Sequence, residues 1–195
     1  MRYPPEQTAE KHQRILDAAT RMFRDNGFSG VNIAALMQAA GLTHGSFYSH
    51  FESKQDLVAE CIAHAASESL DKMQCFPATA TGLKNYIRTY LSITHRDDPG
   101  SGCLMAALAS EVGRELPAKK SMTQHVQMFV EKMTSHFPWS KTYVRRSEAI
   151  RMTASLVGAV ILARAVEDED FSREILKEVA GGLISRIGAE AKEAA

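Results

Sequence analysis

The apolar residues of this chain recur at the spacing of α-helices. Within residues 15–23, the five at positions 15, 18, 19, 22 and 23 form one stripe along a helix. Asn26 and Gly27 follow this stripe and predict the end of the helix, because glycine readily adopts the left-handed conformation found there. No alternating pattern of useful length indicates a β-strand. The pattern therefore predicts an all-α protein.

Two short helices joined by a tight corner are predicted next. Asn32 can cap the first of them, and Gly41 ends it. Its buried face is expected to consist of four apolar residues, Ile33, Leu36, Met37 and Ala40. Thr43 can cap the second helix, which is expected to run through Phe51. Two helices joined in this way form a helix-turn-helix.

The rest of the chain predicts longer helices. Ser53 and Asp56 resemble a capping box that opens a helix to about residue 74. Further helices are expected at about 82–95, 102–113, 116–136, 141–167 and 171–190, between segments rich in Pro, Gly and Ser. We therefore expect a three-helix helix-turn-helix domain over residues 1–53 and a helical domain over residues 54–195.

Composition narrows the class of protein only slightly. The chain has 195 residues, of which 45% are hydrophobic and 24% are charged, as is typical of globular proteins. Lys plus Arg equals Asp plus Glu at 23 each, so the net charge neither favours nor excludes nucleic acid. The three cysteines lack a paired spacing, and the sequence shows no export signal and no apolar run that could span a bilayer. We therefore expect a cytoplasmic protein that does not bind membranes.

The stretch GLTHGSFYSHFESKQDL at 41–57 combines an apolar and a polar face. Phe47 and Phe51 are four residues apart, so both can pack on the two preceding helices. Gly45 leaves room for close approach of another surface, and Lys54 stands at a helix N-terminus that favours an anion. Hydroxyl and imidazole groups can donate to phosphate oxygens without net positive charge. The expected DNA-binding residues are Asn32, Thr43, His44, Gly45, Ser46, Tyr48, His50 and Lys54.

Residues 13–57 resemble the DNA-binding domain of the TetR family of bacterial transcriptional repressors. The match is carried by ILDAATRMFRDNGF and IAALMQAAGLTHGSFYSHFESKQDL, and the motif T-x-G-x-F-Y-x-H-F-x-S-K-x-x-L is filled from Thr43 to Leu57. Two positions depart from the family pattern: Val31 replaces a usual Thr, which removes one candidate phosphate contact, and Met37 replaces a common Ala. The resemblance implies an Ω-shaped homodimer that binds a palindromic operator. It also implies a C-terminal helical domain that binds a small molecule and dimerises through its last two long helices.

The last two predicted helices are rich in apolar residues, which can form either core or a dimer interface. Glycines at positions 158, 181 and 182 interrupt them. A glycine inside a helix costs about 1 kcal/mol relative to alanine, so we expect close backbone packing at these positions. The candidate interface residues are Val157, Ile161, Leu183, Ile184 and Ile187.

Cys103 is the candidate effector-binding or thiol-sensing residue. It follows Ser101 and Gly102 at a predicted helix N-terminus, where a thiolate is stabilised, and the alternative is a small buried residue at a helix start. His95 and the two aspartates at 97 and 98 precede it and raise the alternative of a Cys-His enzyme. Their stretch has a loop composition, and no oxyanion-hole motif follows it. The two histidines of the short helix lack further ligands at metal-binding spacing, so no metal is expected.

The sequence therefore predicts a ligand-responsive transcriptional regulator, not an enzyme, that acts without a cofactor. Its expected partners are double-stranded operator DNA, a second copy of the chain and an unidentified small-molecule effector. The alternatives are a helical ligand-binding or scaffold protein without DNA binding and, after it, a Cys-His enzyme.

Overall fold

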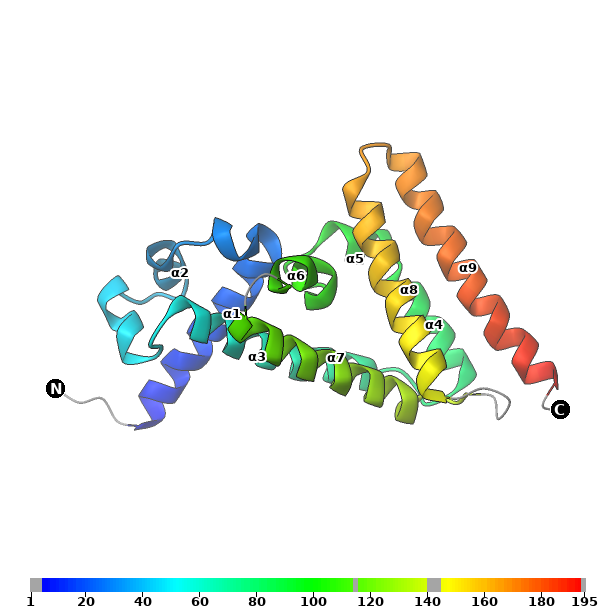
Figure 1. Ribbon diagram of the computed structural model, residues 1–195, viewed down its shortest axis with the longest axis horizontal. Helices are drawn as coiled ribbons and strands as arrows, with labels where there is room; N and C mark the ends of the chain where they lie inside the picture. The colour runs from blue at the N-terminus through cyan, green and yellow to red at the C-terminus, as the bar shows by residue number, and fades with distance from the viewer. Residues whose placement is uncertain (1–4, 114–115, 140–144, 194–195) are drawn as a thin grey trace.

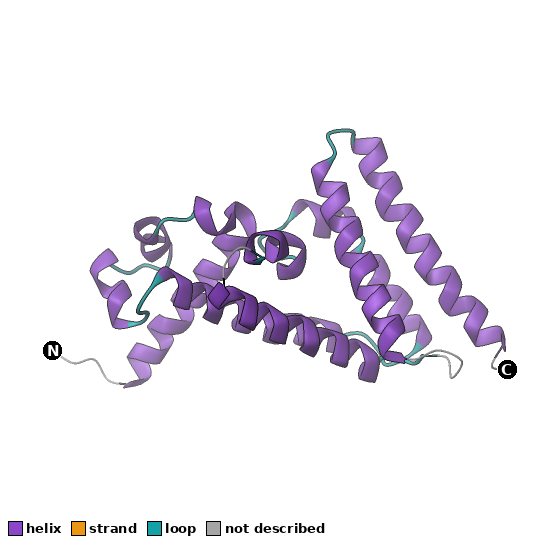
Figure 2. Cartoon of the chain, viewed as in Figure 1, coloured by secondary structure: helices purple, strands orange, loops and turns teal. Residues whose placement is uncertain are grey.

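The computed structural model describes residues 5–113, 116–139 and 145–193. In this part of the chain all regular structure is helical, as predicted (Figure 2). The first three helices, which we call the head, are α1 (Pro5–Gly30), α2 (Ile33–Ala39) and the 3-10 helix η1 (His44–Ser49). They lie at one end of the molecule, and the C-terminal helix pair lies at the other (Figure 1).

The corners of the head follow the predicted signals closely. Gly27 interrupts α1 with a φ of 70°, and Gly41 has the same left-handed φ after α2. Asn32 caps α2 through its side-chain oxygen, which accepts from the backbone N–H of Ala35 at 2.7 Å. Thr43 occupies the N-cap position of η1 but makes no side-chain capping bond. The short helix is a 3-10 helix that ends at Ser49, two residues before the expected end.

Seven helices follow the head in the described part of the chain. They are α3 (Lys54–Gln74), α4 (Ala80–Tyr90), α5 (Ile93–Asp97), α6 (Leu104–Val112), α7 (Leu116–His136), α8 (Arg145–Ala165) and α9 (Glu169–Glu193). The single helix expected at 82–95 is wrong, because Ser92 caps a separate α5 by accepting from the backbone N–H of His95 at 3.1 Å. The expected start of α8 at 141–144 lies outside the described residues.

One continuous hydrophobic core joins the head to the other helices. In the head, Phe23, Phe47 and Leu36 are at most 1% exposed. Phe47 and Phe51 both pack inward, as predicted, with ring centroids 5.6 Å apart. α1 packs on α3 and α6, while α3 packs along α7. The head is therefore seated on the helices that follow it.

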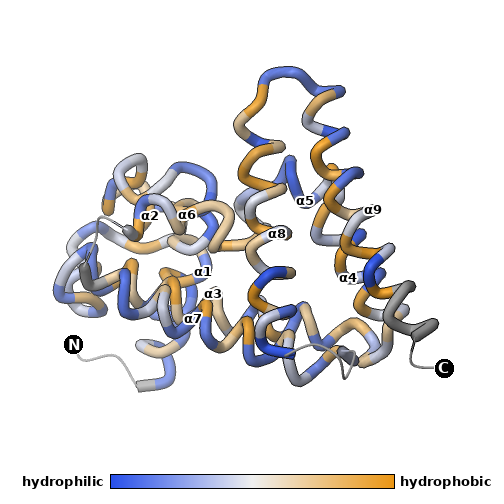
Figure 3. The backbone as a smooth tube through the Cα atoms, turned by 45° about the vertical axis from the view of Figure 1, so that its right-hand side comes forward, coloured by the Kyte–Doolittle hydropathy of each residue, from blue (hydrophilic) through white to orange (hydrophobic). Residues whose placement is uncertain are grey.

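Helices α8 and α9 form an antiparallel pair with many apolar residues (Figure 3). Four of the candidate interface residues, Val157, Leu183, Ile184 and Ile187, are partly buried against the core of their own chain. The fifth, Ile161, is 41% exposed, and its neighbour Leu162 is 57% exposed. A Cβ added at Gly158, Gly181 or Gly182 would meet no atom within 4 Å, so the close packing expected at these glycines is not found within one chain. None of the described helices has the length and apolarity that crossing a membrane requires.

Candidate nucleic-acid interface and effector cavity

Six of the eight residues expected to bind DNA lie on η1 or at its two caps, while Asn32 caps α2 and Lys54 begins α3. None of the eight is buried, and Tyr48 is 66% exposed, the most of any large hydrophobic residue described. The Tyr48 ring stands edge-on to Phe47, with centroids 5.2 Å apart, and edge-on to His44 at 6.5 Å. The buried phenylalanine thus holds an exposed tyrosine in place on the surface.

Gly45 occupies a position where the fold itself does not require glycine. Its φ is not in the left-handed range, and an added Cβ would meet no atom within 4 Å. Gly41 is different, because it has a φ of 70° and an added Cβ would approach Arg14 Nη2 to 2.5 Å. The same Arg14 atom donates to the carbonyl of Ala40 at 2.6 Å and fixes the corner. Gly45 therefore leaves a bare patch of backbone on the outward face.

Lys54 connects the start of α3 to the start of α2. Its ammonium donates to the carbonyl of Val31. The Val31 side chain is 3% exposed and packs in the core, so the departure from the family pattern at this position places an apolar group inside. Ser53 caps α3 by accepting from the N–H of Asp56 at 3.1 Å. An ammonium has three N–H donors, so Lys54 retains donors for an anion beside this helix N-terminus.

His50 lies at the edge of the same face, beside a hollow of about 540 Å³ that Thr43 and Ser46 also line. Burial lowers the pKa of His50, and the positive charges of His12 and Lys11 lower it further. The neutral imidazole therefore predominates at neutral pH, and His50 can donate one hydrogen bond to a phosphate without adding charge.

A second cavity, of about 600 Å³, lies among α3, α4, α5, α7 and the segment before α6. Its wall includes the aromatic residues Phe76, Tyr86, Tyr90 and Phe129, together with His95 and Cys103. Sequence analysis singled out Cys103 and His95 in this group but not the two tyrosines. The spacing of Tyr86 and Tyr90, four residues apart on α4, is the signal in the sequence that could have pointed to them.

Cys103 takes the N-cap position of α6, as predicted, and is 7% exposed. Its backbone N–H donates to Nε2 of His95 at 3.0 Å, and Nδ1 of His95 therefore carries the proton and donates to the Tyr90 carbonyl at 2.5 Å. Burial lowers the pKa of His95, which agrees with this neutral form. Both ring nitrogens bind the backbone, so His95 does not serve as a base for the Cys103 thiol. The Cys-His enzyme alternative has no support in this geometry.

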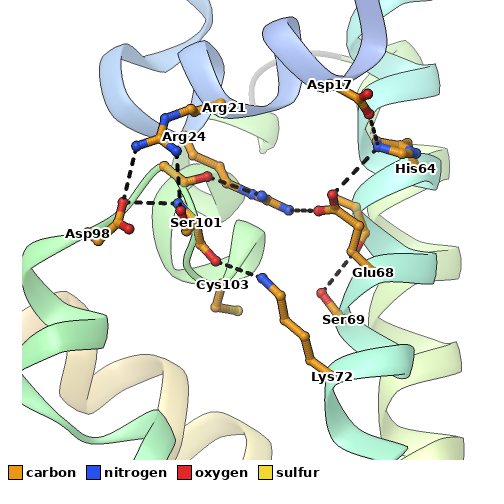
Figure 4. A network of polar contacts seen from close by, with 12 residues as sticks. Asp17, Arg21, Arg24, His64, Glu68, Ser69, Lys72, Asp98, Ser101 and Cys103 are labelled. Atoms are coloured by element: carbon orange, nitrogen blue, oxygen red, sulfur yellow. Dashed lines mark hydrogen bonds and ion pairs between the residues drawn. The ribbon is translucent and has the colours of Figure 1, made fainter. Parts of the chain in front are cut away.

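The segment 98–103, which we call the linking segment, forms part of the cavity wall and also contacts α1 (Figure 4). The buried Arg24 of α1 donates to the Gly100 carbonyl at 3.2 Å and to Glu68 of α3 at 2.8 Å. A Cβ added at Gly100 would lie 2.7 Å from both carboxylate oxygens of Asp25. Lys72 donates to the Ser101 carbonyl at 2.8 Å. The wall of the cavity therefore lies directly against the head.

The other end of α6 also contacts α1. Glu111 accepts from the backbone N–H of Phe28 at 2.8 Å, just after the interruption of α1. An added Cβ at Gly27 would approach the same carboxylate to 2.5 Å, so the approach is close. α6 is therefore attached to the head at both of its ends. Among the described residues, no group of three or more His, Cys, Asp or Glu side chains is arranged to hold a metal ion.

Comparison with known proteins agrees with this arrangement. Residues 15–61 match the family model described as bacterial regulatory proteins, tetR family. The HTH-type transcriptional regulator AcrR of Shigella flexneri is 40% identical over 55 residues, which are 28% of this chain and 26% of AcrR. The HTH-type transcriptional repressor KstR2 of Mycolicibacterium smegmatis is 31% identical over 99 residues, 47% of each chain. The chain thus spans less than half the length of these two relatives.

The resemblance in fold extends over nearly the whole chain. The crystal structure of a TetR-family transcriptional regulator from Agrobacterium tumefaciens superimposes with a TM-score of 0.74 at 21% identity, covering 91% of this chain and 97% of that one. Residues 15–61 therefore match the tetR family of bacterial regulatory proteins in sequence, and nearly the whole chain is similar in fold to a solved regulator of that family.

Proposed function

We propose that the chain is a ligand-responsive transcriptional repressor that acts in the cytoplasm and binds a palindromic DNA operator as a homodimer. The observation that carries the proposal is the outward face of η1, where the exposed Tyr48 and the bare backbone at Gly45 flank a helix whose other side is buried. Such a face suits a helix that enters a major groove and donates to phosphates on either side. Residues 1–53 act as the DNA-binding domain, and residues 54–195 bind the effector and dimerise.

The effector site is the 600 Å³ cavity. An effector changes operator affinity only through its different affinities for the two arrangements of the heads. The linking segment supports such a difference, because it belongs to the cavity wall and touches α1. Cys103 contacts the effector or reacts with it. A mild thiol reagent that releases DNA from the wild type but not from Cys103→Ser would establish the reactive role.

A mobility shift with the DNA upstream of the protein's own gene tests the proposal. We expect a discrete complex that survives an excess of unrelated DNA, with an affinity that falls steeply as salt increases. Scrambling one half of the palindrome should abolish the complex, because the dimer needs both half-sites. Equal binding to upstream and unrelated DNA would contradict the proposal, and no binding to either would favour a scaffold protein.

A further inference from the structure

Two tyrosines on one face of α4 line the cavity. Tyr86 and Tyr90 are 6% and 8% exposed, and their ring centroids are 6.0 Å apart. The Tyr90 hydroxyl is buried and has no nitrogen or oxygen partner among the described residues. Its neighbour in the wall is the Cys103 thiol, and a thiol is a weak hydrogen-bonding group. A buried hydroxyl without a good partner is costly in a folded protein, so the group is expected to serve something that the chain alone lacks.

Both hydroxyls are neutral hydrogen-bond donors. Burial raises the pKa of Tyr86 and of Tyr90 well above the usual value, and the nearby Cys103 raises both further. His95 cannot take their place, because both of its ring nitrogens already bind the backbone. Among the buried residues of the described wall, the tyrosines are the ones that carry hydroxyl donors for a ligand.

The charged residues of the cavity wall lie toward solvent. Lys72 and Arg88 are exposed and Asp98 is partly exposed, whereas Tyr86 and Tyr90 are buried. A charged group enclosed beside the tyrosines would lose its hydration without a charged partner among the buried residues of the wall, which is costly. The wall therefore favours a ligand whose enclosed part is uncharged.

The shape of the wall favours a ring. Phe76 meets Tyr86 edge-on with centroids 5.3 Å apart, and the Phe137 ring lies 5.7 Å from Tyr86 in a tilted arrangement. Phe129 closes the cavity from α7. Aromatic pairs at such distances gain from edge and offset contacts, and a flat ring can extend the same cluster.

We propose that the effector of this cavity is an uncharged ring compound whose oxygen accepts a hydrogen bond from the Tyr90 hydroxyl, and that a second oxygen on the ring adds a bond with Tyr86. The inference deepens the proposed function, since it names the class of molecule to which the regulator responds. It assigns Tyr90 as the residue that selects an oxygen-bearing ring over a bare one.

Calorimetric titration of the full-length protein tests the inference without DNA. The four ligands are naphthalene, 2-naphthol, 2,6-dihydroxynaphthalene and 2-naphthoate. In the wild type we expect each added hydroxyl to tighten binding by about two- to tenfold, the worth of one net hydrogen bond. 2-Naphthoate should bind more weakly than 2-naphthol. Tyr90→Phe should lose the gain from the first hydroxyl and leave naphthalene binding unchanged, while Tyr86→Phe should lose the gain from the second.

The stability of the free protein supplies a second readout. Because Tyr90→Phe removes a buried hydroxyl without a good partner, its thermal midpoint should equal or exceed that of the wild type. Tyr48→Phe, which alters an exposed tyrosine on the head, is the control for these two measurements alone and should change neither 2-naphthol affinity nor the thermal midpoint. Retention of the full 2-naphthol gain in Tyr90→Phe, or a clear fall in its thermal midpoint, would overturn the inference. Operator binding by the same variants reports separately on the proposed function.

Discussion

In the head, neighbouring side chains have different roles: some are buried and stabilise the fold, and others are exposed on the surface. Phe47 is fully buried, while the adjacent Tyr48 is 66% exposed and rests edge-on against it. Burial of a large aromatic ring stabilises the fold, whereas the exposed ring contributes little to stability. The two neighbours can therefore be changed with separable consequences.

Tyr48→Ala should weaken DNA binding without destabilising the protein. We expect about two- to tenfold lower affinity, by the same factor on operator and on unrelated DNA, because a phosphate contact carries no sequence information. Fluorescence anisotropy with labelled duplexes measures both affinities, and thermal unfolding checks the fold. Unchanged affinity with an intact fold would remove Tyr48 from the interface.

His125 should make the fold sensitive to acid. Its ring is buried and neither nitrogen has a partner among the described residues; burial and, to a lesser extent, the nearby Arg24 together lower its pKa to about 4. The unfolded state has an ordinary histidine pKa and therefore binds the proton first as the pH falls. Above about pH 6.5 His125 does not reduce the free energy of unfolding, and below this pH the free energy of unfolding decreases. Between pH 7 and 5 we expect this group alone to cost about 2 kcal/mol.

Urea unfolding of His125→Phe across this pH range isolates that contribution. The variant should lose less stability between pH 7 and 5 than the wild type does. His44→Phe, a change at an exposed histidine, is the control and should follow the wild type. Parallel curves for wild type and His125→Phe would refute the assignment.

Local signals explain which elements could be predicted from the sequence. Asn32 and Ser53 act as caps within three residues of their partners, so their pattern is visible in the chain itself. The break between α4 and α5 has no glycine or proline, and Ser92 alone did not reveal it. The cavity could not be predicted either, because Tyr90 and Cys103 are far apart in the sequence and come together only in the folded chain. The contact of Gly100 with Asp25 likewise depends on tertiary structure.

At the scale of elements, α6 and the linking segment before it lie between the cavity and the head. Gly100 and Glu111 mark its two attachments, and both are close contacts with α1. The buried Arg24 at the first attachment keeps an Nε atom without a partner. An attachment made largely of polar contacts and one unpaired donor can rearrange at lower cost than a packed apolar one.

Gly100→Ala should shift the head on its support, because the new methyl group would lie 2.7 Å from the Asp25 carboxylate. We expect operator affinity to change at least threefold, because the new position of the head alters how the two recognition helices meet the DNA. Gly113→Ala, at the other end of α6, is the control, because its new methyl group meets only the Ser110 carbonyl at 3.6 Å. Identical operator affinity in the two variants would show that the first attachment does not position the head.

At the scale of the molecule, α8 and α9 leave an apolar surface uncovered. Ile161, Leu162 and Phe171 are 41%, 57% and 50% exposed, and the glycines at 158, 181 and 182 leave open space beside the backbone. Exposed apolar residues next to glycines suit the close approach of another helix pair. This surface supports the proposal of a two-fold dimer through α8 and α9.

Ile161→Glu should dissociate the dimer, because a carboxylate would be buried without a counter-charge. We expect light scattering to give the mass of one chain at micromolar concentration, and operator affinity should fall by at least a hundredfold when the second half-site is lost. Ile93→Glu, at an isoleucine of α5 with 43% exposure, is the matched control and should remain dimeric. A monomeric wild type would contradict this arrangement.

The double attachment of α6 has a consequence for building biosensors from this protein. A chimera that joins the head of one regulator to the sensing domain of another is usually cut between domains. Here such a cut would pair a foreign α1 with the native Gly100 and Glu111. Gly100 lies against Asp25 of the native α1, and Glu111 lies against Gly27, where the native α1 is interrupted. Residues 98–113 should therefore be transferred together with the head, so that the chimera keeps both sides of this contact.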